Sequence, residues 1–103
     1  MIVYANDENY DELVSEGIVI ADFFGKTCGP CKMVARSLEE IDDEFPFIKI
    51  VKVDVDDCPK KSDEFHIEGI PDLFYYKDGK IISEDPGAVD TEYIRNKLAN
   101  IIY

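Results

Sequence analysis

The sequence is poor in basic side chains and has no long apolar run. Its 103 residues carry 11 lysines and arginines against 23 aspartates and glutamates, a formal net charge of -12. Such a charge disfavours nucleic acid and anionic membranes as partners. No apolar run approaches the roughly 20 residues that a membrane-spanning helix needs, and the first residues lack the pattern of a signal peptide. We therefore expect a cytoplasmic protein.

Cysteine and histidine are also few, with three cysteines and one histidine. An odd number of cysteines argues against a framework of structural disulfides, because a chain with 46% hydrophobic residues can build a core without them. Cys28 and Cys31 form a Cys-Gly-Pro-Cys motif. The alternatives to a redox role are half of a zinc site or an inert buried pair. No second Cys-x-x-Cys or histidine pair supplies the remaining zinc ligands, so we expect neither metal nor cofactor.

The spacing of apolar residues predicts five strands and four helices in a single domain over residues 1–103. The first half is expected to contain a strand over 2–4, a helix capped by Asn6 and ended by Gly17, a strand over 18–24, and a helix from the cysteine motif to Pro46. The second half is expected to contain a strand over 47–55, a helix over 59–65, and two antiparallel strands over 73–76 and 81–82 joined by Asp78-Gly79. A last helix is expected from about residue 90. This order predicts an α/β fold, with helices on both faces of one mixed sheet.

Several further short motifs accompany the cysteines in a fixed order. They are Asp22 within an apolar strand, Lys52 in Val-Lys-Val-Asp, Gly69-Ile70-Pro71, Lys77-Asp78-Gly79, and Gly87-Ala88 before the last helix. With these landmarks the whole chain resembles the thioredoxin family. The resemblance implies a thioredoxin fold, in which a five-stranded mixed sheet is flanked by four helices, and a thiol–disulfide oxidoreductase activity.

The cysteine motif lies at a junction between a strand and a helix, where two thiols can form a redox pair. Unpaired amides at the start of the helix favour a thiolate at Cys28, the expected nucleophile. Cys31 lies one turn inside the helix, so it suits attack on a mixed disulfide formed at Cys28. The expected product is a Cys28–Cys31 disulfide. Gly29 lets a partner's backbone approach, and Pro30 presets a helical dihedral angle.

A carboxylate within a buried strand is costly unless it is protonated or paired. Asp22 is in this position, and Lys52 shares a strand face with Ile48 and Ile50, so it too is expected to be partly buried. We expect a raised pKa for Asp22. The resemblance places Asp22 behind the dithiol with Lys52 nearby, and implies that Asp22 helps move the proton of Cys31. A structural buried ion pair is the alternative.

The resemblance also implies a platform for substrates beside the dithiol. A cis Ile70–Pro71 bond would face the cysteines, and the backbone of Ile70 would pair with an extended substrate segment. Gly87 would lie on the same rim and leave room for a partner. From the residues alone, Pro71 can be merely the first residue of a strand, and Gly87 a plain loop glycine.

Two positions depart from the family pattern at this rim. Thr27 stands where the family usually has tryptophan, a residue this chain lacks, and Asp72 stands where many members have threonine. The charge of Asp72 would oppose a Cys28 thiolate if the two lie close together. Lys26 and Lys32 flank the motif and either offset that charge or are solvated surface lysines.

Two other residues could carry chemistry. Cys58 is expected to be a plain third thiol, although its place at a helix start leaves a reactive thiol as the alternative. His66 is expected to cap a helix end rather than transfer protons.

The leading functional prediction is a monomeric thiol–disulfide oxidoreductase that reduces protein disulfides through Cys28 and Cys31. The resemblance implies that a thioredoxin reductase recharges it. The alternatives are an oxidase or isomerase of the same fold, and a binding subunit that does not turn over its thiols.

Overall fold

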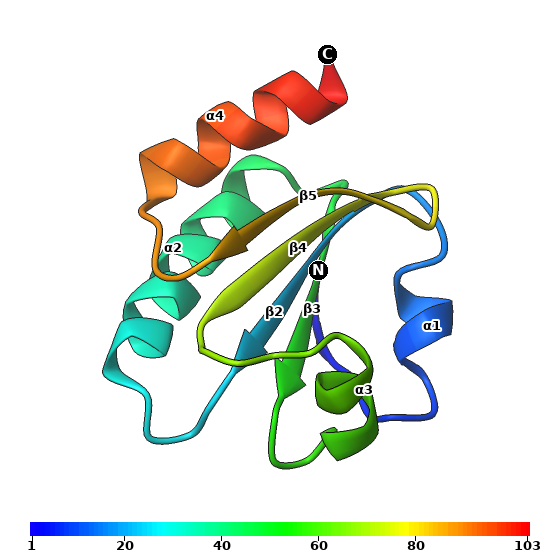
Figure 1. Cartoon of the computed structure of the whole chain (residues 1–103). Coiled ribbons are helices and arrows are strands. Elements are labelled where there is room, and N and C mark those ends of the chain that lie inside the picture. The colour runs from blue at the N-terminus through cyan, green and yellow to red at the C-terminus, as the bar shows by residue number, and fades with distance from the viewer.

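A computed structural model describes residues 1–103 and contains one five-stranded sheet with four helices (Figure 1). The elements are β1 (Ile2–Tyr4), α1 (Tyr10–Leu13), β2 (Ile18–Phe24), α2 (Gly29–Glu44), β3 (Lys49–Asp54), α3 (Pro59–Glu64), β4 (Asp72–Lys77), β5 (Lys80–Pro86) and α4 (Thr91–Ile102). The strand order is β1-β3-β2-β4-β5. β3 is parallel to β1 and β2, whereas β4 is antiparallel to β2 and β5. The predicted α/β fold is confirmed.

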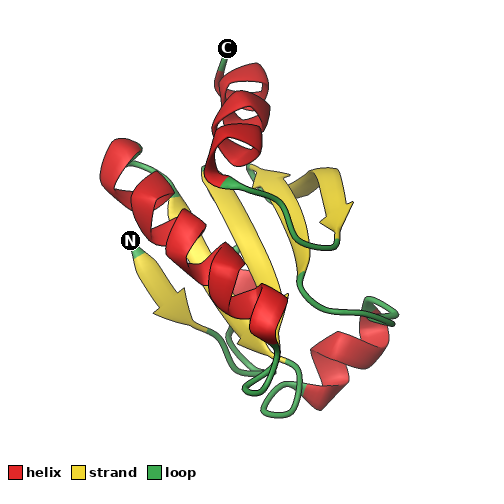
Figure 2. Cartoon of the chain, turned by 90° about the vertical axis from the view of Figure 1, so that its left-hand side faces the viewer, coloured by secondary structure: helices red, strands yellow, loops and turns green.

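Helices cover both faces of the sheet (Figures 1 and 2). Because side chains alternate along a strand, β2 sends Val19, Ala21 and Phe23 into the core beneath α1 and α3, and Ile20 into the core beneath α2 and α4. Tyr10 of α1 and Cys58 at the start of α3 belong to the first core. Asp22 follows Ile20 by two residues, so it lies on the face that α2 and α4 cover.

The long helix α2 has the limits that its sequence predicts. Cys28 is its N-cap, and Pro30 lies in the first turn, where proline needs no amide partner. Val34, Leu38 and Ile41 form the buried stripe. The helix ends at Glu44, just before Pro46. Its first turn therefore presents the two cysteines at the end of the central strand β2.

The helix α1 is shorter than predicted, and Asn6 is not its N-cap. The Asn6 side chain accepts hydrogen bonds from the amides of Glu8 and Asn9, at 2.9 and 2.8 Å, and closes a turn before the helix begins. The helix spans Tyr10–Leu13, and its N-cap Asn9 makes no capping hydrogen bond. A short polar side chain can bond to nearby amides in a turn as readily as in a cap, so the sequence pattern alone did not separate the two.

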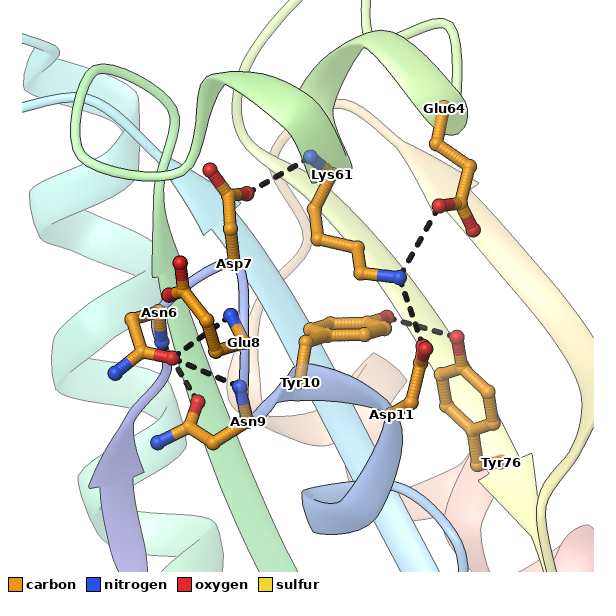
Figure 3. A network of polar contacts seen from close by, with 9 residues as sticks. All are labelled: Asn6, Asp7, Glu8, Asn9, Tyr10, Asp11, Lys61, Glu64 and Tyr76. Carbon is orange, nitrogen blue, oxygen red and sulfur yellow. Dashed lines mark hydrogen bonds and ion pairs between the residues drawn. The ribbon is translucent and has the colours of Figure 1, made fainter.

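A polar network joins α1 to α3 and β4 (Figure 3). The carboxylate of Asp7 accepts from the Lys61 amide at 3.0 Å, at the start of α3. The Lys61 ammonium donates to Asp11 at 2.8 Å and to Glu64 at 3.1 Å. Beside it, the Tyr10 and Tyr76 hydroxyls lie 2.7 Å apart. These contacts fasten the two short helices to the sheet.

The hairpin between β4 and β5 turns at Asp78 and Gly79, as predicted. Both residues have positive φ, +50° and +83°, the conformation that a tight two-residue turn requires. The strand β5 runs to Pro86, further than the sequence indicated. Its extra length brings Glu84 alongside β4. None of the helices is long and apolar enough to cross a membrane.

Candidate active site

The two cysteines of the motif form a disulfide at the start of α2. Cys28 is partly exposed, whereas Cys31 is 3% exposed. The sulfur of Cys28 accepts a hydrogen bond from the Cys31 amide at 3.2 Å. An amide donor and the positive end of the helix dipole both stabilise negative charge. In the reduced form, this arrangement favours a thiolate at Cys28.

The surface around Cys28 is open. Thr27, Gly29 and Pro30 are all exposed, and nothing lies within 4 Å of the position that a β-carbon on Gly29 would take. A partner's backbone can therefore approach the Cys28 sulfur without displacing a side chain. The small Thr27 leaves this rim without an aromatic side chain.

Ile70 faces the dithiol from the loop before β4. The Cys28 sulfur lies 3.9 Å from the Ile70 carbonyl oxygen. On its other side Ile70 packs against Gly25, where an added β-carbon would come within 2.6 Å of Ile70 Cδ1. Gly25 thus allows the loop and the dithiol to come together. The sequence predicted only that the strand ends before Gly25, because this contact joins segments far apart in the chain.

Asp22 and Lys52 form an ion pair behind the cysteines. They are opposite one another in the register of β2 and β3, and Lys52 Nζ lies 2.6 Å from Asp22 Oδ2. Asp22 is 0% exposed and Lys52 6%. Burial raises the pKa of Asp22, although Lys52 acts in the opposite direction. The other carboxylate oxygen, Oδ1, has no hydrogen-bond partner.

A cavity of about 150 Å³ lies between Lys52 and the dithiol. Cys31, Lys52 and Phe24 are among its lining residues. The Lys52 ammonium lies 4.6 Å from the centre of the Phe24 ring. The cavity is wide enough to hold water beside Cys31 and Lys52.

The Ile70–Pro71 bond is cis. The Pro71 carbonyl accepts a hydrogen bond from the Gly87 amide at 2.9 Å, which joins the two rim segments. Gly87 has φ +115°, a conformation that side chains other than glycine rarely adopt. A cavity of about 400 Å³ opens between these segments, and Glu68, Asp72 and Glu84 line it with them. We call it the Pro71 cavity.

Asp72 is buried in the wall of the Pro71 cavity, with 6% of its surface exposed. Burial, and after it the neighbouring acids Glu84 and Asp85, raise its pKa to about 7. At neutral pH the carboxyl group is therefore only partly ionised. Any repulsion of a Cys28 thiolate is weaker than a fully charged aspartate would exert.

Replacing Asp72 with asparagine should stabilise the fold above neutral pH. The pKa of an unfolded aspartate is about 3.9, whereas that of folded Asp72 is about 7. The protonated group thus contributes stability that is complete below pH 4 and is lost as the pH rises towards 7. We expect Asp72→Asn to gain about 2 kcal/mol over the wild type at pH 8 and little at pH 4.5. Urea unfolding at both values measures this.

The exposed Asp43→Asn serves as the matched control for that comparison, because it removes one charge from the surface of α2. An equal gain from Asp43→Asn would assign the effect to net charge. A gain for Asp72→Asn that does not change with pH would contradict the raised pKa.

Three other residues considered from the sequence lie away from the sulfurs or have other partners. Lys26 pairs with Asp54 at 2.9 Å and with Asp57 at 3.2 Å, so it ties the cysteine loop to the end of β3. Cys58 is fully buried, and burial with nearby acids raises its pKa, which opposes a reactive thiolate. His66 lies just beyond α3, after the C-cap Phe65, with φ +52°.

Comparison with known proteins decides the family. The family model described as Thioredoxin matches residues 1–100 of the chain. The chain belongs to the thioredoxin family. Similar members include the thioredoxin of Chlamydia trachomatis serovar D, which is 36% identical over 92 residues, or 89% of this chain and 90% of the relative.

Two other relatives in this family are still closer in identity. The thioredoxin of Bacillus subtilis strain 168 is 42% identical over 87 residues, covering 84% of each chain. Thioredoxin C-2 of Corynebacterium nephridii is 40% identical over 104 residues, covering 98% of this chain and 93% of the relative. With the Cys28–Cys31 pair in place, this family member is a thiol–disulfide oxidoreductase. Members of this family act on disulfide substrates and are themselves reduced by a reductase.

Proposed function

We propose that the chain reduces disulfides in other proteins, with Cys28 as the nucleophile and Cys31 as the resolving thiol. The single observation that supports this most strongly is the hydrogen bond from the Cys31 amide to the Cys28 sulfur. The amide donates a hydrogen bond to the more exposed of the two sulfurs, and it would stabilise a negative charge there. Cys31, at 3% exposed, is shielded from external disulfides but not from a disulfide at Cys28.

The reaction transfers two electrons in two exchanges. The Cys28 thiolate attacks one sulfur of the substrate disulfide, and the other substrate sulfur leaves as a thiolate. Cys31 then loses its proton and attacks the Cys28 sulfur, so that the Cys28–Cys31 bond forms as the second substrate sulfur leaves. Both substrate sulfurs take up protons from solvent, and the protein is left oxidised.

Asp22 is proposed to accept the proton of Cys31 during the second exchange. A base whose pKa is raised by burial is better matched to a thiol near neutral pH than an ordinary aspartate. The cavity bordered by Cys31 and Lys52 is wide enough for water, which would carry that proton to the surface. Lys52 orients the carboxylate through its 2.6 Å contact.

Substrates are proposed to bind as extended segments across Thr27, Gly29, Pro30 and the loop from Ile70 to Asp72, with Gly87 on the far rim. The open surface at Gly29 and the Ile70 carbonyl 3.9 Å from the Cys28 sulfur support this arrangement. Main-chain contacts of this kind tolerate many substrate sequences.

We further propose a thioredoxin reductase as the electron donor, because the oxidised pair must be recharged for each turnover. Residues 1–103 are proposed to act as a single domain and as a monomer. A reducing dithiol is maintained in compartments where thiols are kept reduced, so we propose a cytoplasmic location.

Trapping with Cys31→Ser tests the proposed function. Without the resolving thiol, the first exchange should leave Cys28 joined to the substrate in a stable mixed disulfide. We expect insulin with intact disulfides and a thioredoxin reductase to be captured by this variant, seen as adducts that dithiothreitol releases. The double variant Cys28→Ser Cys31→Ser is the control. Equal capture by the control would show a binding module without thiol turnover.

A further inference from the structure

The Pro71 cavity is lined by three acidic side chains and by His66. Glu68, Asp72 and Glu84 contribute three carboxyl groups to a space of about 400 Å³, and no lysine or arginine is among its lining residues. The charge comes from three parts of the chain: Glu68 lies in the loop before β4, Asp72 is the first residue of β4, and Glu84 lies in β5.

One carboxyl oxygen of Asp72 has no hydrogen-bond donor. Asp72 is 6% exposed, and its Oδ1 atom makes no hydrogen bond. A buried acceptor without a donor is unfavourable, whereas a charged donor placed beside it forms a strong bond. Glu84, which faces Asp72, is an acceptor as well when ionised. Both groups would therefore gain from the arrival of a cationic donor.

No three histidine, cysteine or acidic side chains in the protein are grouped so as to hold a metal ion. The cavity is also an open cleft rather than a small cage, so its shape suits a long cationic side chain. Lysine and arginine have such side chains, and both offer several donors.

The cavity adjoins the dithiol. Ile70 contributes to its lining and also has its carbonyl oxygen 3.9 Å from the Cys28 sulfur. Asp72 follows two residues later, a distance of at most about 7 Å along the chain. A substrate segment whose cysteine reacts with Cys28 thus carries its neighbouring side chains past the cavity.

We propose that the Pro71 cavity binds a lysine or arginine side chain close to the reactive cysteine of the substrate. This inference rests on the proposed function, and it adds a preference for basic segments among disulfide substrates. Asp72 and Glu84 are the specificity-determining residues, and Glu68 contributes at the entrance.

Binding of a cation would also favour loss of the proton from Asp72. Glu84 of β5 and Glu68 and His66 of the loop before β4 line the cavity with Asp72. Asp85 of β5 also acts on Asp72 through its charge, but it lies towards α4, where it pairs with Lys97 at 2.8 Å. Because an adjacent ammonium or guanidinium favours the ionised carboxyl, the preference for basic substrates should increase between pH 6 and pH 8.

Matched peptides test the proposal. Each peptide carries one cysteine joined to 2-nitro-5-thiobenzoate by a mixed disulfide, with arginine, glutamine or glutamate placed two residues before or after it. Pre-reduced protein releases one coloured thiolate per peptide. We expect the wild type to reduce at least one arginine peptide about tenfold faster than its glutamine partner, and the glutamate peptide most slowly.

In Asp72→Asn Glu84→Gln, the arginine-to-glutamine ratio should fall to about two or less. The control Glu39→Gln Asp43→Asn removes two exposed charges from α2 and should keep the wild-type ratio. If the double cavity variant fails to unfold cooperatively, Glu68→Gln, at an exposed position, should still lower the ratio.

Equal rates for arginine and glutamine peptides in the wild type would overturn the proposal while leaving the proposed function intact. The same conclusion follows if the α2 control loses the preference as fully as the cavity variant, since the net charge would then explain it. Absence of release from every peptide would instead contradict the proposed function.

Discussion

Cys28→Ser is expected to lower the rate of insulin disulfide reduction by at least about 10³-fold. A serine hydroxyl is not ionised near neutral pH, so the helix amide that approaches the Cys28 sulfur at 3.2 Å has no thiolate to stabilise. The partly exposed position of Cys28 makes it the only sulfur of the pair that a bulky disulfide can reach. Turbidity of reduced insulin, followed with excess dithiothreitol, measures the rate above the uncatalysed background.

The matched control for this loss is Cys58→Ser, which removes the third thiol. Cys58 is buried and donates to the Ala5 carbonyl at 3.3 Å, away from the dithiol. We expect that variant to retain the wild-type rate per folded molecule. Residual activity in Cys28→Ser that disappears on replacing Cys58 would contradict the assignment of Cys28 as the nucleophile.

Asp22→Asn is expected to stabilise the protein at pH 8 and to slow the resolving step about tenfold. The folded pKa of Asp22 lies above its unfolded value because burial outweighs the effect of Lys52. The protonated carboxyl therefore contributes stability below about pH 4, and that contribution is lost as the pH rises through the folded pKa. Asparagine does not ionise, so it avoids the loss.

Two measurements separate the effect of Asp22→Asn on stability from its effect on the resolving step. Urea unfolding between pH 4 and pH 8 should show a gain for Asp22→Asn that increases with pH, while the exposed Asp43→Asn shows none. Rapid mixing of pre-reduced protein with a disulfide peptide should show normal formation of the mixed disulfide and slow release of the second thiol. A normal release rate together with the stability gain would leave Asp22 a structural ion-pair partner only.

The two raised carboxyl groups lie on different sides of the same sheet and differ in their surroundings. Asp22 is fully buried against a single ammonium, whereas Asp72 lies in the wall of an open cavity among other acids. The first is suited to hold a proton near the sulfurs. The second is suited to a cation that arrives with the substrate.

Much of the fold was predictable because its signals are local. The apolar run of β2, the stripe of α2 and the Asp78-Gly79 turn each depend on residues that are neighbours in sequence. The prediction was wrong at Asn6, where a turn and a helix cap use the same hydrogen bonds.

The candidate site was only partly predictable, because some of its contacts join segments that are far apart in sequence. The Cys-Gly-Pro-Cys turn is contiguous, so its place between a strand and a helix could be read directly. Asp22 and Lys52 were suspected separately, but their 2.6 Å contact depends on the register of two strands 30 residues apart. Gly25 and Glu84 gave no signal of their own, because their partners Ile70 and Asp72 come from distant segments.

By itself, the sequence determined that a dithiol stands at the start of a helix, because the cysteines, the preceding strand and the helix are consecutive. Only the tertiary structure decided what surrounds that dithiol. Burial and electrostatic fields at a group are set by every element that packs against it, however distant in sequence. Asp72 is only 6% exposed, and it lines an acidic cavity together with Glu84. Both facts depend on the extension of β5 to Pro86 alongside β4, which the sequence did not show.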